Sequence, residues 1–167
     1  MTIDEFIRLF STFERSAFRL ETRQQYLVDE EAELVRAFSE GRPPPPSAAM
    51  DQWLALIAAN TAAGKRMYRV RIIETPLTGY VRWELSSYAD NAAAGEEIFI
   101  ADRAVLPDLR EDFWLFDDRD VVTLRYDDDG RWLGVERRPG SGLVHYRAMR
   151  DLALGETVPL PDYRARA

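Results

Sequence analysis

Residues 112–136 constrain the fold most, because they predict three adjacent strands joined by two short acidic turns. Residues 113–116, FWLF, form a continuous apolar run, which is typical of a short strand buried on both faces. Farther on, Val122, Leu124 and Tyr126 alternate with polar residues, so the next strand has one apolar face. Asp and Gly at 127–130 tolerate the positive φ of tight hairpin turns. The segment therefore predicts a scaffold of strands and indicates no chemistry.

Composition predicts one globular domain over residues 1–167. The chain has 167 residues and 46% hydrophobic content, which is enough for a single packed core. It has no cysteine, so disulfides, thiolate metal sites and thiol catalysis are excluded. It has one histidine, which excludes a histidine-rich metal site.

The formal charge of −7 opposes a phosphate backbone, so we expect no direct binding to nucleic acid. Charged residues interrupt residues 2–13 where a signal peptide would need an apolar segment. The longest weakly polar run, residues 53–59, is far shorter than the roughly 20 residues that cross a bilayer. We therefore expect a cytoplasmic protein without membrane contact.

Helices and strands are predicted along the whole chain without regular alternation. Thr2 and Glu5 form a capping box that starts the first helix. Further helices are expected at 29–38, 48–63, 79–88 and 143–154, and further strands at 17–22, 66–74 and 97–101. Four prolines at 43–46 predict a spacer, and residues 155–167 a flexible tail. The fold class is therefore α+β, loosely α/β-like: a mixed sheet with helices packed on it, and a C-terminal hairpin followed by a closing helix.

Candidate ligand-binding residues lie mainly in residues 66–88. Arg69 and Arg71 share one face of a predicted strand, where they would hold an anion or pair with surplus carboxylates. Tyr80 and Arg82 would stack on a ring or pack in the core. With three carboxylates, these residues form the predicted ligand-binding set: Arg69, Arg71, Tyr80, Arg82, Glu84, Asp112 and Asp117.

No catalytic residue, metal site or cofactor is predicted. His145 lies in the predicted last helix without a nearby nucleophile in sequence, and we interpret it as structural. Residues 125–136 partly match a calcium-binding loop, but Arg125 occupies the position of the first carboxylate and the flanking segments alternate like strands. An exposed acidic turn is the better interpretation.

Four fragments, AFRLET, YVRWEL, AGEEI and DFWLFDDRDV, resemble an uncharacterised actinobacterial family of single domains. Genes of that family often lie near XRE-type helix-turn-helix regulators, so the resemblance implies a regulatory or partner-binding role.

A weaker resemblance, at the level of the fold, is to phospholipase-D-like domains. Catalytic members carry the pattern HxKxxxxD. When Asp117 is aligned to its aspartate, Arg110 and Asp112 replace the histidine and the lysine. Without an imidazole nucleophile that reaction cannot run, so such a domain would be a degenerate enzyme fold kept as a binding surface.

The sequence thus predicts a non-catalytic binding or regulatory domain. We expect a protein partner, such as a basic DNA-binding regulator, which the acidic surface would attract. The alternative is a carboxylate-based hydrolase or transferase that acts on a small anionic substrate. Its carboxylates would come from Glu84, Glu96, Asp112 and Asp117, with Arg69 or Arg71 holding the substrate.

Overall fold

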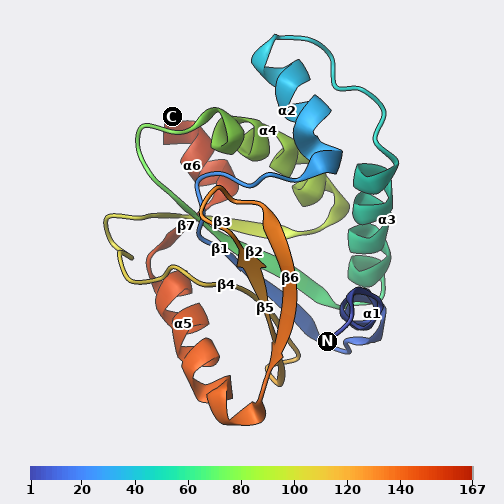
Figure 1. The fold of residues 1–167 in the computed structure, drawn as a ribbon, viewed down its shortest axis with the longest axis vertical. Coiled ribbons are helices and arrows are strands. Elements are labelled where there is room, and N and C mark those ends of the chain that lie inside the picture. Colours follow the sequence, from blue (N-terminus) through green and yellow to red (C-terminus); the bar gives the residue numbers. More distant parts are fainter. Residues whose placement is uncertain (167) are drawn as a thin grey trace.

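A seven-stranded mixed sheet forms the centre of the computed structural model, which describes residues 1–166 and the side chains of residues 1–164 (Figure 1). The strand order is β6-β5-β4-β1-β2-β3-β7. Strands β1, β2 and β3 are parallel, and the others are antiparallel to their neighbours. The strands are β1 (Ser16–Glu21), β2 (Arg66–Ile73), β3 (Glu97–Asp102), β4 (Asp112–Phe116), β5 (Asp120–Tyr126), β6 (Trp132–Arg138) and β7 (Thr157–Pro159).

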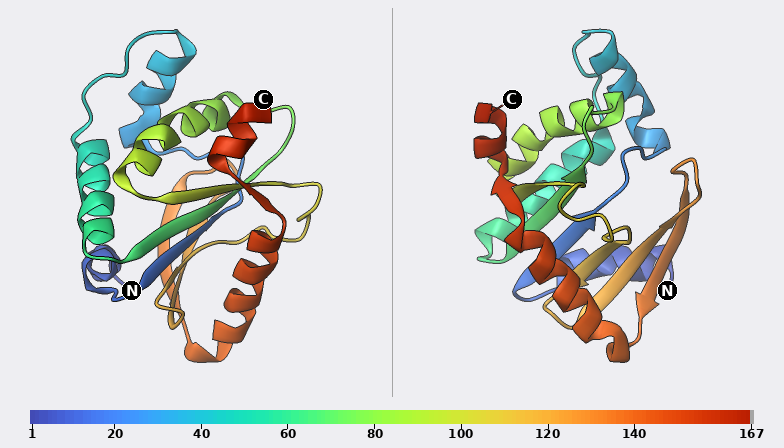
Figure 2. Two further views of the ribbon diagram at one scale, coloured as in Figure 1. Left: turned by 180° about the vertical axis from the view of Figure 1, so that it is seen from behind. Right: turned by 90° about the vertical axis from the view of Figure 1, so that its left-hand side faces the viewer.

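Helices pack on both faces of this sheet (Figure 2), which confirms the predicted α+β class. Helix α5 covers one face, and α1, α3 and α4 cover the other. Residues 43–46 join α2 to α3 without regular secondary structure. The helices are α1 (Ile3–Thr12), α2 (Ala32–Ser39), α3 (Ala48–Ala62), α4 (Gly79–Ala94), α5 (Leu143–Gly155) and α6 (Leu160–Arg166), with short 3-10 turns at Asp29–Glu31 and Gly140–Gly142.

Strands β1 and β2 divide their side chains between two different environments. Because successive residues of a strand point to opposite faces, Phe18 and Val70 join the apolar core under α5. Their neighbours Arg19, Arg69 and Arg71 point to the other face, where α4 crosses the sheet, and all three are buried. The sheet therefore has an apolar face toward α5 and a charged region toward α4.

Helix α4 is longer than predicted. The predicted helix ended at residue 88, whereas the observed helix continues to Ala94 and ends at Gly95, whose φ of +112° provides a left-handed cap. Asn91 stays helical because its buried side chain donates to Glu96. In α5, helical periodicity from Leu143, Tyr146 and Met149 would place Leu152 on the inner face, but Leu152 is exposed and Ala153 is buried in its place.

The predicted flexible tail instead contains a strand and a helix. Residues 157–159 form β7, which pairs with the otherwise free edge of β3. In α6, Leu160 is buried beside Val81 and Leu85. The hairpin of β5 and β6 followed by α5 was predicted correctly, but α5 does not close the fold. A three-residue strand carries too little periodicity to be recognised without its partner edge.

The turn between β5 and β6 fastens the sheet to the loop that follows β1. Gly130 has a φ of +90°, and its carbonyl oxygen accepts from the backbone N–H of Leu27 at 2.9 Å. A Cβ atom at residue 130 would lie 2.6 Å from the carbonyl oxygen of Gln25, so only glycine fits there.

Gly130→Ala should therefore destabilise the protein more than Gly64→Ala. Gly64 has a similar φ of +77° but nothing within 4 Å of its Cβ position. Gly64→Ala therefore introduces the backbone strain without the steric clash. We expect Gly130→Ala to cost about 1–3 kcal/mol more in the free energy of unfolding, measured by chemical denaturation. Equal losses for the two variants would contradict the close packing of this loop on the hairpin.

Candidate functional site: a buried charge network beneath an aromatic cavity

Seven charged side chains are buried together between the sheet and α4. The parallel register of β1 and β2 sets Arg19 beside Arg69 and Glu21 beside Arg71. Helix α4 and strand β4 bring further carboxylates to this cluster, as does the residue just before β3. None is more than 8% exposed, and together they form what we term the charge network: Arg19, Glu21, Arg69, Arg71, Glu84, Glu96 and Asp112.

Arg69 is the most completely paired member of the network. Its Nε and Nη2 atoms donate to the two carboxylate oxygens of Glu96 at 2.7 and 3.1 Å. Its Nη1 donates to Oε2 of Glu21 at 2.9 Å, and the Tyr88 hydroxyl donates to the same oxygen at 2.6 Å. Burial alone would raise the pKa of Glu21, but Arg69 and Arg19 lower it to about 2. Glu21 is therefore held as a carboxylate.

Asp112 joins the network to the loop after β1. It accepts from Nη2 of Arg19 at 3.0 Å and from the hydroxyl of Tyr26 at 2.5 Å. It also accepts from the backbone N–H and the hydroxyl of Thr22, at 2.9 and 2.7 Å. Four hydrogen bonds leave this carboxylate little capacity to accept another group.

Arg71 is fully buried and pairs with α4. Its Nε donates to Oε2 of Glu84 at 2.5 Å, and its Nη1 donates to the carbonyl of Ile72 at 3.2 Å. Its guanidinium carbon lies 5.5 Å from the centroid of the Tyr26 ring. Burial raises the pKa of Glu84 to about 7, although Arg71 opposes this effect. Glu84 is therefore the network carboxyl that gains or loses a proton near neutral pH.

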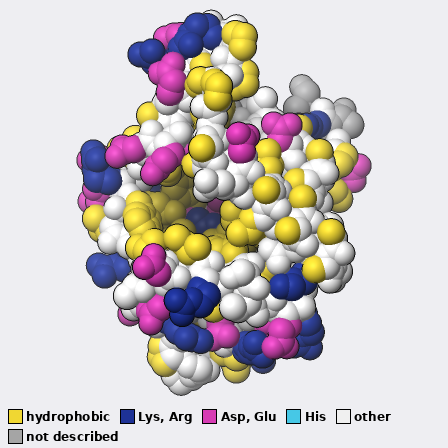
Figure 3. Space-filling view, turned by 90° about the vertical axis from the view of Figure 1, so that its right-hand side faces the viewer, with side chains coloured by type: hydrophobic (Ala, Val, Ile, Leu, Met, Phe, Trp, Pro, Cys, Tyr) yellow, Lys and Arg dark blue, Asp and Glu magenta, His cyan; other side chains and the backbone are white. Residues whose placement is uncertain are grey.

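A cavity of about 150 Å³ lies above the network and has aromatic walls. Four rings follow one another along it, from Trp83 to Tyr80, Tyr26 and Tyr126, with centroids 5.3, 5.6 and 5.1 Å apart. Trp53 of α3 also lines it, as do Arg19 and Glu84 of the network. Figure 3 shows a hollow of this composition, with hydrophobic walls and a basic side chain visible at its floor.

Two polar groups in this cavity are incompletely paired. The Nη1 atom of Arg19 is buried and makes no hydrogen bond within the described residues. Burial raises the pKa of the neighbouring Tyr126 hydroxyl to about 12, and the Arg19 guanidinium opposes this shift. Glu31 accepts from the Tyr80 hydroxyl at 2.7 Å, and burial raises its pKa despite that bond.

Most of the predicted ligand-binding residues come together here, and two do not. Arg69, Arg71, Glu84 and Asp112 belong to the charge network, and Tyr80 lines the cavity. Their role in binding a ligand stays a prediction. Arg82 is exposed on the outer side of α4, because a helix turns residues two positions apart onto different faces.

Asp117 is buried at another place, the turn between β4 and β5. Its carboxylate accepts from the backbone N–H groups of Glu14, Arg15 and Ser16 at 2.8, 2.7 and 3.0 Å. Burial alone would raise the pKa of Asp117, but these N–H groups lower it overall. Asp117 thus fastens the β4–β5 turn to the start of β1.

The sequence analysis missed Arg19, Glu21 and Glu31 as site residues. Arg19 and Glu21 alternate with apolar residues in the predicted strand at 17–22, and this alternation gives no reason to expect their face to be buried. A usable signal was present: RLE at residues 19–21 and RVR at residues 69–71 both put charges at alternate positions of strongly apolar strands. No local pattern marks Glu31.

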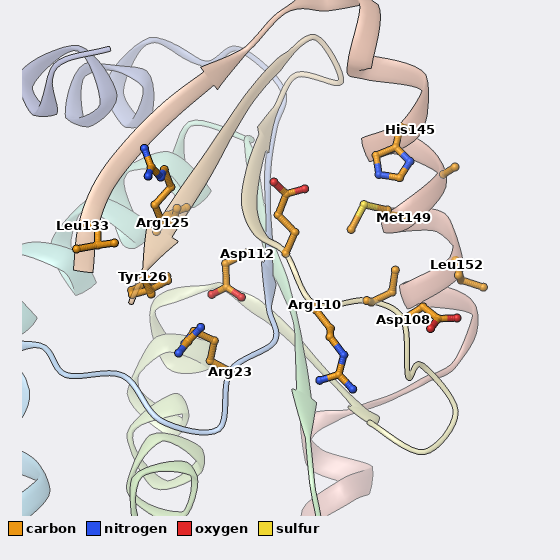
Figure 4. Close-up of a pocket in the computed structure, with 14 residues that line it drawn as sticks. Arg23, Asp108, Arg110, Asp112, Arg125, Tyr126, Leu133, His145, Met149 and Leu152 are labelled. Atoms are coloured by element: carbon orange, nitrogen blue, oxygen red, sulfur yellow. The ribbon is translucent and has the colours of Figure 1, made fainter. Parts of the chain in front are cut away.

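A second, wider hollow lies between α5 and the ends of β5 and β6 (Figure 4). This groove has a volume of about 820 Å³. In Figure 4, His145 and Met149 extend from α5 toward the strands, and Asp112 lies between the two sides. His145 is exposed, and Asp112 already accepts a hydrogen bond from Arg19. Each hollow is lined by an arginine with a buried, unpartnered N–H group, Arg23 in the groove and Arg19 in the aromatic cavity. The aromatic cavity is the stronger candidate site, because Arg19 is buried within a charge network whereas Arg23 is only half-buried.

The described residues contain neither a membrane-spanning helix nor a metal-binding cluster of acidic or histidine side chains. No helix there combines the length and the apolar character needed to cross a bilayer. No group of three or more histidine, aspartate or glutamate side chains in that part of the chain is arranged to hold a metal ion.

Comparison with models of known protein families identifies the family of this chain. The model of a domain of unknown function, DUF6879, matches residues 4–165. The chain belongs to the DUF6879 family. The match covers almost all of the 167 residues, so the charge network and the cavity both lie inside this DUF6879 domain. None of the curated proteins with which the domain was compared matches it.

The stability of the DUF6879 domain should fall as pH rises from 5 to 8. The pKa of Glu84 is about 7 in the folded protein against an ordinary value of 4.5, so the folded state binds the extra proton between these values. Above pH 7 Glu84 loses this proton in the folded state, and the free energy of unfolding falls by on the order of 1–3 kcal/mol. The raised pKa of Glu31 acts in the same direction.

Glu84→Gln should flatten this pH dependence, because glutamine cannot ionise. Chemical denaturation at several pH values measures the effect, with the exposed Glu97→Gln as control. An unchanged slope in Glu84→Gln would show that another group causes the pH dependence.

Proposed function

We propose that this DUF6879 domain is a non-catalytic binding domain that holds a small ligand in its aromatic cavity. One observation carries the proposal: the Arg19 side chain lines the cavity, and its buried Nη1 has no hydrogen-bond partner among the described residues. An unpartnered buried donor costs about 1–3 kcal/mol, which a ligand with an acceptor group would offset.

The pairing of the network supports binding rather than catalysis. A general acid or base needs a group that is free to exchange a proton with the substrate. Glu21 and Glu96 are held by Arg69, and Asp112 already accepts four hydrogen bonds. These groups are arranged to hold their positions, which suits a preformed binding site.

A regulatory setting for this binding fits the charge of the domain. The net charge of −7 would attract a basic protein, such as a DNA-binding regulator, by long-range steering. We propose such a regulator as the partner, with the ligand in the cavity as the signal. An association that weakens as salt concentration rises would support this part of the proposal.

A thermal-shift screen against small polar metabolites tests the binding function. We expect at least one compound to raise the midpoint of unfolding, because a ligand that binds only the folded state stabilises it. Met50 lines the cavity, so Met50→Trp should fill it and abolish the shift. Gln52→Trp adds the same side chain at an exposed position of the same helix and should keep the shift. No stabilising compound, or an equal shift in Met50→Trp, would refute the proposal.

One observation favours a second function, hydrolysis or group transfer on a small anionic substrate. Glu84 lines the aromatic cavity and has a pKa of about 7, which suits a general acid or base. The arginines predicted to hold the substrate, Arg69 and Arg71, are already paired with Glu96, Glu21 and Glu84, so the substrate would have to displace one of these pairs. Turnover of small phosphate and carboxylate esters should then fall at least about 100-fold in Glu84→Gln. Turnover that survives this change would exclude Glu84 as the catalytic group.

A further inference from the structure

Side chains of both charges line the aromatic cavity, and Arg19 and Glu31 lie beside opposite ends of its row of three tyrosines. Glu21 and Arg69, which pair with each other, also line it. One end holds Arg19, beside Tyr126. The other end holds Glu31, which accepts from the Tyr80 hydroxyl at 2.7 Å, and Glu84. Tyr80 and Glu84 are four residues apart on α4, so they lie on the same side of that helix. The row of four aromatic rings joins the two ends.

The cavity and the network beneath it carry more carboxyl groups than arginines. The residues at and below the cavity include five carboxyl groups, those of the network and Glu31, against three arginines. Glu31 forms no ion pair among the described residues, since only the Tyr80 hydroxyl bonds to it. Glu84 has one oxygen on Arg71. Burial raises the pKa of both carboxyls, as expected for acids that lack a compensating positive charge.

The walls near this end suit a cation. Tyr80 and Trp83 of α4 have ring centroids 5.3 Å apart, and Trp53 of α3 lines the same cavity. The faces of aromatic rings attract ammonium groups, most strongly when carboxylates stand nearby and water is excluded. A simple anion would instead add negative charge to a site that already has a surplus.

The opposite end suits a carboxylate. Arg19 uses Nη2 on Asp112 at 3.0 Å, and its Nε lies 3.5 Å from Glu21. Nη1 is buried without a hydrogen-bond partner among the described residues, and the Arg19 side chain lines the cavity. A guanidinium with an unpartnered N–H group in a partly enclosed site is a natural hydrogen-bond donor to carboxylate oxygens.

We propose that the ligand is a small zwitterion, with its carboxylate on Arg19 and its ammonium between Glu31 and Glu84 against the aromatic rings. The cavity volume of about 150 Å³ limits the ligand to the size of a free amino acid or a betaine. This inference rests on the proposed binding function and deepens it, because it names the class of ligand. A zwitterion supplies a negative group for Arg19 and a positive group for Glu31 and Glu84, and it adds no net charge to the site.

Three compounds of nearly equal shape test the proposal by isothermal titration calorimetry. Glycine betaine carries both charges, choline lacks the carboxylate, and 3,3-dimethylbutyrate replaces the positive nitrogen with carbon. L-proline and L-valine extend the test to secondary and primary ammonium groups. We expect at least one zwitterion to bind about tenfold or more tightly than choline and 3,3-dimethylbutyrate, since each of these loses one charged contact.

Glu31→Gln tests the acidic end without disturbing the buried network. It should weaken binding of the zwitterion at least about fivefold and leave any binding of 3,3-dimethylbutyrate unchanged. The adjacent, exposed Glu30→Gln should bind like the unaltered protein. Circular dichroism spectra and unfolding midpoints verify that both variants fold.

The outcomes separate this inference from the proposed function. If no zwitterion binds more tightly than choline and 3,3-dimethylbutyrate, the inference is overturned. If a compound of another class stabilises the protein and Met50→Trp abolishes that stabilisation, the binding function is supported and the zwitterion inference is wrong. If no compound of any kind binds, both the binding function and the zwitterion inference are wrong.

Discussion

The burial of three arginines on one face of the sheet is the constraint on which the rest of the structure depends. Removing a guanidinium from water costs several kcal/mol unless carboxylates and hydrogen bonds replace the lost solvent. Arg69 meets this requirement with Glu96 and Glu21, Arg71 with Glu84, and Arg19 with Asp112. Each carboxylate comes from a different segment, so the network fixes how α4, β3 and β4 sit against β1 and β2.

The charged floor also explains why a cavity exists. Where the floor is apolar, side chains of α1 and α3 pack directly on it, as Phe10 and Ile57 do around Trp114. Above the network the covering residues are tyrosines and tryptophans, whose rings pack while their polar atoms reach hydrogen-bond partners. Rings standing over fixed charges leave a hollow instead of a filled core.

Parts of the site were within reach of sequence reasoning. The alternation in β2 correctly separated Tyr68, Val70 and Ile72 from Arg69 and Arg71. It did not show that both faces are buried, since an arginine on a strand more often points to solvent. The same limit applies to Asp117, which resembled its neighbours in an acidic turn but accepts three backbone N–H groups from a distant segment.

The sequence by itself determined the local elements: the capping box of α1, the buried strand β4, the acidic turns and the hairpin of β5 and β6. These depend on residues close together in the chain, whose periodicity and turn preferences are visible in one dimension. The tertiary structure alone decided that Glu31, Arg19 and Glu84 share a cavity, and that residues 157–159 complete the sheet. Such partners are brought together by strand order and helix packing, which depend on long-range contacts that no local pattern records.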